Sequence, residues 1–231
     1  MSLTQSAERA ALNKLIDYLD DNPQENIDKI MDLVNKLVPN RVFPVQREAF
    51  TNVIKSRGNW YDLIMRVFSL NPQMRTKLLK TLIVDANLLA WPEQEKNREK
   101  YQCNVPWAIL LDPTSACNLH CTGCWAAEYG YKQNLSFEDI DSIVTQGKAL
   151  GTHIYIYTGG EQLVRKRDLI RICEKHQDCA FLCFTNSTLI DEKFADDMLR
   201  VKNFIPAISL EGFEEATDGR RGSGVYDKVL H

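Results

Sequence analysis

The sequence predicts an α/β fold with a parallel sheet, preceded by a region made of helices alone. Up to residue 91, apolar residues recur at helical spacing; from Val105 onward, strand-like apolar runs alternate with amphipathic helical stretches. Such alternation favours parallel strands joined by right-handed helical crossovers. We therefore predict an all-α N-terminal domain over 1–91, a linker over 92–104 and an α/β core over 105–231.

The N-terminal domain is expected to hold four or five helices. Asn22-Pro23 and Asn71-Pro72 each precede a periodic stretch. Asn accepts hydrogen bonds from the first free amides of a helix, and Pro needs no donor at the first helical position, so both pairs are typical of helix starts. The segment 92–104 is charged and lacks an apolar face, which favours a linker.

Four strands are expected in the core, at 107–112, 153–157, 180–185 and 204–210. Helices are expected at 136–149, 162–176 and 191–201, and from Val225. Ser136 and Asp139 fit a capping box, and Gly151 fits a C-terminal stop. Because only four strands precede His231, one sheet edge is expected to lack a neighbour.

The composition is that of an ordinary globular protein. Of 231 residues, 44% are hydrophobic and 26% charged, and the net charge is −3. This charge gives no case for a nucleic-acid partner. No apolar run approaches the roughly 18 residues of a membrane helix, and no signal peptide is recognisable, so we expect a cytoplasmic protein without a membrane partner. In that compartment the seven cysteines indicate thiols or metal ligands rather than disulfides.

Three cysteines gather on the loop that follows the first predicted strand. Cys117, Cys121 and Cys124 are separated by three and two residues. Loops at the carboxyl ends of strands carry the chemistry of α/β folds. Three thiolates can hold three irons of a cubane cluster that usually takes four, and the open iron is typical of a working site. A zinc knuckle is the alternative, but no second ligand pair follows at suitable spacing.

This loop resembles that of the radical SAM superfamily. The resemblance continues at 157–161, 184–187 and 208–212, each at the end of a predicted strand. It implies a partial (β/α) barrel of the radical SAM type, of which 105–231 holds the first four β/α units and which is incomplete at the C-terminus. It also implies a [4Fe–4S] cluster on the three cysteines and S-adenosyl-L-methionine on the open iron, which together generate a 5′-deoxyadenosyl radical.

The resemblance assigns cofactor-binding roles at the ends of the strands. Gly159, Gly160 and Glu161 would bind the methionine amino group. Ser209 and Glu211 would meet the ribose hydroxyls.

For three further candidate cofactor contacts, the sequence also allows a role that involves no cofactor. Trp125 follows the third cysteine, whereas the family usually has an aromatic residue before it; Trp125 packs on adenine or belongs to the core. Arg221 binds the methionine carboxylate or is solvated. Asn186 is a ligand contact or a turn residue. No catalytic residue is assigned beyond the cluster.

Two loop residues depart from the family pattern. Gln162 stands where Pro is usual, and Ser187 where Gly is usual; if that position needs a positive φ, Ser187 bears a steric cost. Looser loops and the missing strands lead us to expect weak S-adenosylmethionine binding and poor turnover by the chain as written. The other four cysteines, namely Cys103, Cys173, Cys179 and Cys183, are expected in the core rather than on a second cluster.

The predicted function is that of a radical SAM enzyme, an oxidoreductase supplied with electrons by a donor such as flavodoxin or ferredoxin. Peptide or protein modification is the leading expectation, because the order of the motifs resembles the peptide-maturing branch. The alternative is a truncated, non-catalytic metal-binding relative that acts as a binding or interaction protein.

Overall fold

The structure, a computed structural model, describes residues 3–38, 42–126, 130 and 132–231. The chain divides into two compact units, Met1–Lys80 and Thr81–His231. No helix in the described ranges has both the length and the apolar character needed to cross a membrane.

The first unit is helical, as predicted. Its helices are α1 (Leu3–Asp21), α2 (Pro23–Leu37), α3 (Pro44–Ser56), α4 (Asn59–Val67) and α5 (Pro72–Leu79). Both helix starts are confirmed: α2 follows Asn22, and the side chain of Asn71 accepts hydrogen bonds from the second and third amides of α5. Leu19, Ile27 and Ile54 form the buried centre of a small core.

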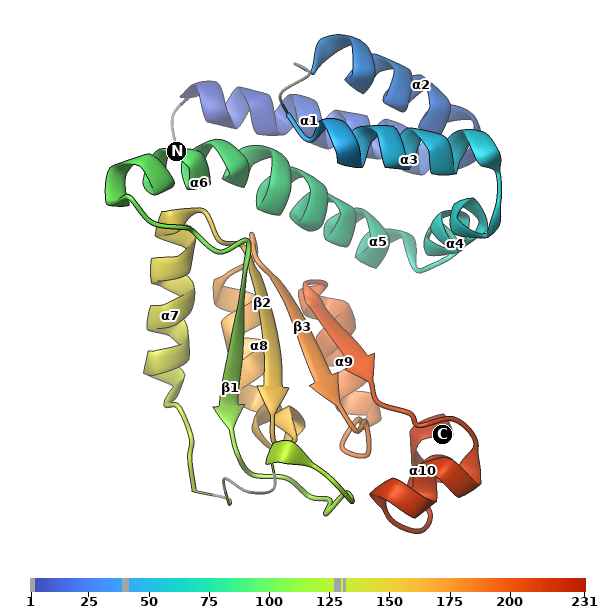
Figure 1. The fold of residues 1–231 in the computed structure, drawn as a ribbon, viewed down its shortest axis with the longest axis vertical. Coiled ribbons are helices and arrows are strands. Elements are labelled where there is room, and N and C mark those ends of the chain that lie inside the picture. The colour runs from blue at the N-terminus through green and yellow to red at the C-terminus, as the bar shows by residue number, and fades with distance from the viewer. Residues whose placement is uncertain (1–2, 39–41, 127–129, 131) are drawn as a thin grey trace. The chain divides into compact units, whose positions relative to one another are not determined.

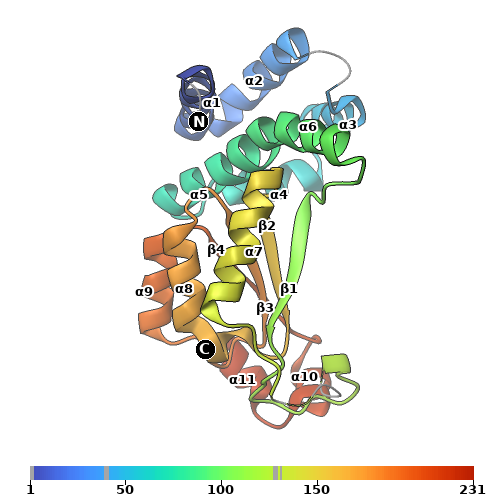
Figure 2. The same ribbon diagram turned by 90° about the vertical axis from the view of Figure 1, so that its left-hand side faces the viewer.

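The second unit is built on a parallel four-stranded sheet. Its strands, β1 (Ala108–Thr114), β2 (Ile154–Gly159), β3 (Ala180–Thr185) and β4 (Phe204–Ile208), pair in sequence order (Figure 1). Helices α7 (Phe137–Leu150), α8 (Lys166–Lys175) and α9 (Glu192–Val201) lie on one face of the sheet (Figure 2). A π-helix, η1 (Lys80–Leu89), and α6 (Ala90–Tyr101) precede β1; the 3-10 helix η3 (Gln162–Arg165) precedes α8, and α10 (Glu214–Arg221) and α11 (Val225–Leu230) follow β4. The predicted α/β fold is confirmed.

The two faces of the sheet differ in burial. Tyr155, Tyr157 and Phe181 face the helices and are fully buried, with ring centroids 5.6 Å and 5.7 Å apart for the two Tyr–Phe pairs. Alternate residues point to the opposite face. There, Leu110 and Phe184 are 61% and 48% exposed. The face that the helices cover therefore holds the core, and the opposite face is partly exposed to solvent.

The N-terminus of α7 has the predicted capping box. The Ser136 hydroxyl accepts from the Asp139 amide at 3.0 Å, and the Asp139 carboxylate accepts from the Ser136 amide at 2.9 Å. At the other end, Gly151 has a φ of 93°, a left-handed conformation that favours glycine. The predicted start and stop of this helix are both confirmed.

A helix, α6, occupies most of the predicted linker over 92–104. This helix packs through polar side chains against the end of α7. The Gln94 amide donates to the Gly151 carbonyl at 2.7 Å, and the Asn97 amide to the Ala149 carbonyl at 3.3 Å. These are carbonyls that a helix end leaves without an intrahelical partner. The division into functional domains stays a prediction.

Candidate functional site

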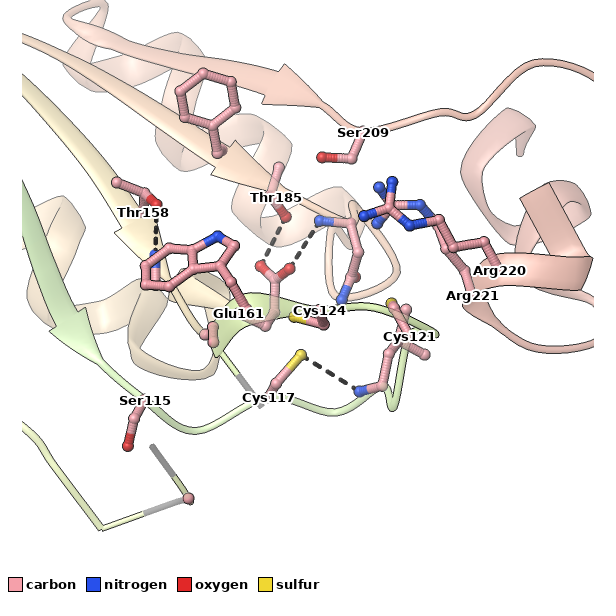
Figure 3. Close-up of a pocket in the computed structure, with 18 residues that line it drawn as sticks. Ser115, Cys117, Cys121, Cys124, Thr158, Glu161, Thr185, Ser209, Arg220 and Arg221 are labelled. Atoms are coloured by element: carbon pink, nitrogen blue, oxygen red, sulfur yellow. Dashed lines mark hydrogen bonds between the residues drawn. The ribbon is translucent and has the colours of Figure 1, made fainter. Parts of the chain in front are cut away.

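The carboxyl ends of the strands open onto a cavity of about 350 Å³ (Figure 3). Loops after all four strands contribute to its wall. Ten of the predicted site residues line it: Cys117, Cys121, Cys124, Trp125, Gly159, Gly160, Glu161, Asn186, Ser209 and Arg221. The structure thus brings together residues as far apart in the chain as Cys117 and Arg221.

The cysteine loop is a tight structure that leads from β1. Cys124 donates its amide to the Cys121 carbonyl at 3.2 Å, and Gly123 between them has a φ of 69°, which glycine adopts at little cost. All three thiols are free. Burial raises the pKa of the Cys117 thiol, and the Leu119 amide, which donates to its sulfur at 3.5 Å, offsets part of that rise. Because metals bind the thiolate form, metal binding at this sulfur releases its proton.

Gly160 allows the loop after β2 to lie directly against the cysteine loop. A Cβ added at this position would lie 2.2 Å from the Ala116 carbonyl oxygen and 2.7 Å from the Ser115 carbonyl carbon. Both neighbours are backbone atoms and cannot move cheaply. The same contact is held by the Glu161 amide, which donates to the Ala116 carbonyl at 2.8 Å. A glycine is therefore required here by close approach.

Glu161 connects the loops after β2 and β3. Glu161 is 2% exposed. Its Oε1 accepts from the Leu163 backbone amide at 3.0 Å and the Thr185 hydroxyl at 2.7 Å, and its Oε2 accepts from the Asn186 backbone amide at 2.7 Å (Figure 3). A carboxylate offers about four acceptor positions. The described donors use three of them, so one acceptor position on Oε2 has no described donor.

The expectation that Gln162 loosens this loop is wrong. Its side chain is fully buried, and its amide donates to the carbonyls of Thr158 and, at 3.4 Å, Gly160. Proline has no such donor. Gln162 therefore ties the two ends of the loop together through its side chain.

The loop after β3 is also fixed by its own side chains. The Asn186 side-chain oxygen accepts from the Thr188 amide at 3.0 Å and the Thr188 hydroxyl at 2.7 Å, so Asn186 acts as a turn residue even though it lines the cavity. Ser187 has a φ of 59°, which confirms that its position demands a positive φ. Its amide donates to the Thr185 hydroxyl at 2.9 Å.

Two arginines share one carboxylate on the β4 side of the cavity. Arg221 donates through Nε to Glu211 at 3.0 Å, and Arg220 contacts the other oxygen of Glu211 at 2.8 Å. Hydrogen bonds from Arg221 and Arg220 lower the pKa of Glu211. Arg221 is thus not a simply solvated side chain, and the group keeps a net positive charge beside Ser209 (Figure 3). Glu211 lies outside the cavity wall, and its ribose contact stays a prediction.

Two aromatic side chains stand half-exposed on the cavity wall. Trp125 is 55% exposed, so the alternative that it belongs to the core is wrong. Phe184, which is 48% exposed, was missed by sequence analysis. The run 180–185 is apolar up to Thr185, so nothing in its sequence indicated that Phe184 is exposed while Cys183 and Thr185 on either side of it are buried. Thr158 and Ser115 also line the cavity and were missed.

The four remaining cysteines lie apart from this cavity. Cys173, Cys179 and Cys183 belong to the hydrophobic core, as predicted. Cys103 is exposed after α6, so the core prediction is wrong for this residue.

A family model described as the radical SAM superfamily matches residues 111–231, more than half of the chain. The chain belongs to the radical SAM superfamily. The matched region begins in β1 and includes the cysteine loop and every residue of the predicted site.

The curated relatives that the chain matches are longer proteins. An uncharacterized protein of Archaeoglobus fulgidus is 31% identical over 142 residues, which are 59% of this chain and 33% of that protein. The Fe-coproporphyrin III synthase of Methanosarcina barkeri is 28% identical over 127 residues, which are 53% of this chain and 32% of that protein. The match therefore spans about a third of each relative.

Among solved structures, the chain is similar to Streptococcus suis SuiB bound to precursor peptide SuiA. The identity is 19% and the TM-score 0.49, and the match covers 66% of this chain and 33% of that chain.

Membership of the radical SAM superfamily implies a [4Fe–4S] cluster and S-adenosylmethionine, and the described cavity fits both. Three of its lining residues carry free thiols, one fewer than a cubane usually takes, which matches a cluster with one iron open to a ligand. The spare acceptor position of Glu161 and the positive arginine pair suit the amino and carboxylate groups of an amino acid. Such a ligand would lie between the two sets of groups.

Proposed function

We propose that this chain is a radical SAM enzyme that holds a [4Fe–4S] cluster through Cys117, Cys121 and Cys124 and binds S-adenosylmethionine in the adjoining cavity. The observation that carries the proposal is that three free thiols share one cavity with the ends of all four strands. A structural metal site would close its coordination with a fourth protein ligand.

The roles of the chain's own residues follow from their contacts. The thiolates would each bind one iron. The spare position on Glu161 and the carbonyls of the glycine loop would accept from the ligand's amino group, and Arg221 would donate to its carboxylate. Trp125 and Phe184 offer half-exposed rings for an adenine or a substrate. When bound, the cluster and S-adenosylmethionine supply radical chemistry that begins with hydrogen abstraction.

For the substrate we retain modification of a peptide or protein, which rests on the order of the motifs. Phe184 lines the cavity and shares with Leu110 the sheet face that the helices leave open; a half-exposed ring at this place suits an apolar part of a substrate. A flavodoxin or a ferredoxin is proposed as the electron donor, because the chain resembles radical SAM enzymes.

The test is S-adenosylmethionine cleavage by protein reconstituted with iron and sulfide without oxygen and reduced with dithionite. We expect 5′-deoxyadenosine and methionine in equal amounts, with no release from the Cys117→Ala variant treated in the same way. Cleavage at the same rate in the variant, or none by wild-type protein that holds its full complement of iron, would contradict the proposal.

A further inference from the structure

Asn118 lies between the first two cysteines, and its side chain spans two loops. Its Oδ1 accepts from the Asn186 side-chain amide at 3.0 Å, and its Nδ2 donates to the Thr188 hydroxyl at 2.8 Å. The Thr188 hydroxyl in turn donates to Asn186 Oδ1 at 2.7 Å. The three side chains form a closed ring in which each donates to the next. Hydrogen bonds arranged in this way polarise and strengthen one another.

The ring is anchored to the buried part of the site. Asn186 is 6% exposed, and its backbone amide donates to Glu161, the residue that joins the loops after β2 and β3. Asn118 itself is exposed, so its position is set by this ring rather than by packing. The ring therefore connects the segment between Cys117 and Cys121 to the loops that follow β2 and β3.

A second pair of hydrogen bonds joins the same loop to α10. The Thr122 amide donates to the Arg220 carbonyl at 2.8 Å, and Arg220 Nε donates back to the Thr122 carbonyl at 3.4 Å. Arg220 is itself paired with Glu211. Asn118 and Thr122, on either side of Cys121, are thus hydrogen-bonded to the loop after β3 and to α10 respectively.

We propose that Asn118 is a positioning residue that sets Cys117 and Cys121 in place for iron through its ring with Asn186 and Thr188. This inference rests on the proposed function. A loop that is ordered before iron binds loses less conformational entropy when the cluster forms, and the cluster is then held more tightly. The hydrogen bonds lie outside the coordination sphere, so their loss should weaken retention without removing a ligand.

Two variants break the ring from different loops. Asn118→Ala removes the side chain on the cysteine loop, and Thr188→Val removes the hydroxyl on the β3 loop with little change of shape. Thr188→Ser keeps the hydroxyl and is the matched control. After reconstitution, we expect iron loss to a chelator to be about tenfold faster in Asn118→Ala and Thr188→Val than in wild type, and unchanged in Thr188→Ser. The double variant should be no faster than the faster single variant, because one ring is broken in each case.

Hydrogen exchange in the iron-free protein gives a second readout. Amides of 117–124 should exchange faster in Asn118→Ala and Thr188→Val than in wild type, which a role confined to the finished cluster would not produce. Wild-type rates of iron loss and of exchange in both variants would overturn the inference. Failure of the proposed function is distinguishable, because wild-type protein would then bind no iron through the three cysteines.

Discussion

Replacing Cys117, Cys121 and Cys124 together with alanine is expected to reduce the iron of anaerobically reconstituted protein from about four per chain to nearly none. The three thiols are the ones that line the cavity, whereas Cys173, Cys179 and Cys183 are buried in the core. Iron and sulfide analysis, together with the visible absorbance of the cluster, makes the measurement.

Cys103→Ala is the matched control, because this cysteine is free and exposed. It should keep about four irons. Undiminished iron in the triple variant would show that the cluster lies elsewhere. About eight irons in wild type, which is two cubanes' worth, would contradict the expectation that the other cysteines hold no second cluster.

The second large effect is expected from Gly160→Ala. The added methyl group would lie 2.2 Å from the Ala116 carbonyl oxygen, so the loop after β2 must move away from the cysteine loop. That movement breaks the hydrogen bond from the Glu161 amide to Ala116 and shifts the Glu161 carboxylate, which joins the loops. We expect the free energy of unfolding to fall by about 1–3 kcal/mol. The affinity for S-adenosylmethionine should fall by about tenfold or more, because its proposed amino-group site is displaced.

Urea unfolding and a ligand titration of the reduced, reconstituted protein measure the two effects. Gly219→Ala is the matched control, since nothing lies within 4 Å of a Cβ added there. This residue lies within α10, where alanine favours the helix, so its stability should be equal or higher. If Gly160→Ala unfolded and bound like wild type, the close approach of the two loops would be of no consequence.

Much of the fold could be predicted because its core is apolar and periodic. β3 spans the predicted 180–185, and the buried rings of Tyr155, Tyr157 and Phe181 come from the predicted runs. Apolar periodicity did not predict α6 and α10, and the reason is the same for both helices. Beyond Ala90 at its first position, α6 buries Gln94 and Asn97, and α10 buries Thr217. Apolar periodicity cannot detect a helix that packs through polar side chains.

Most residues that line the cavity were predictable, but the hydrogen bonds that join its loops were not. The spacing of the cysteines and the glycines after β2 are local features, and each marked a stretch that does line the cavity. The partners of Glu161 are not local: Asn186 lies 25 residues further along the chain. The same holds for Asn118 and Asn186, whose contact joins loops 68 residues apart. Such hydrogen bonds depend on how the strand ends meet, which a single sequence does not encode at any fixed spacing.

We propose that the three cysteines and the loop from Gly159 to Glu161 form one site, in which S-adenosylmethionine would meet the open iron of the cluster. Electron-spin resonance of the dithionite-reduced, reconstituted protein tests it most directly, with spectra recorded before and after saturating S-adenosylmethionine is added. We predict that the ligand changes the g values of the cluster, because it enters the coordination sphere of an iron that no protein thiolate holds. Identical spectra with and without the ligand, from protein that carries a full cluster on Cys117, Cys121 and Cys124, would show that the ligand does not bind the open iron.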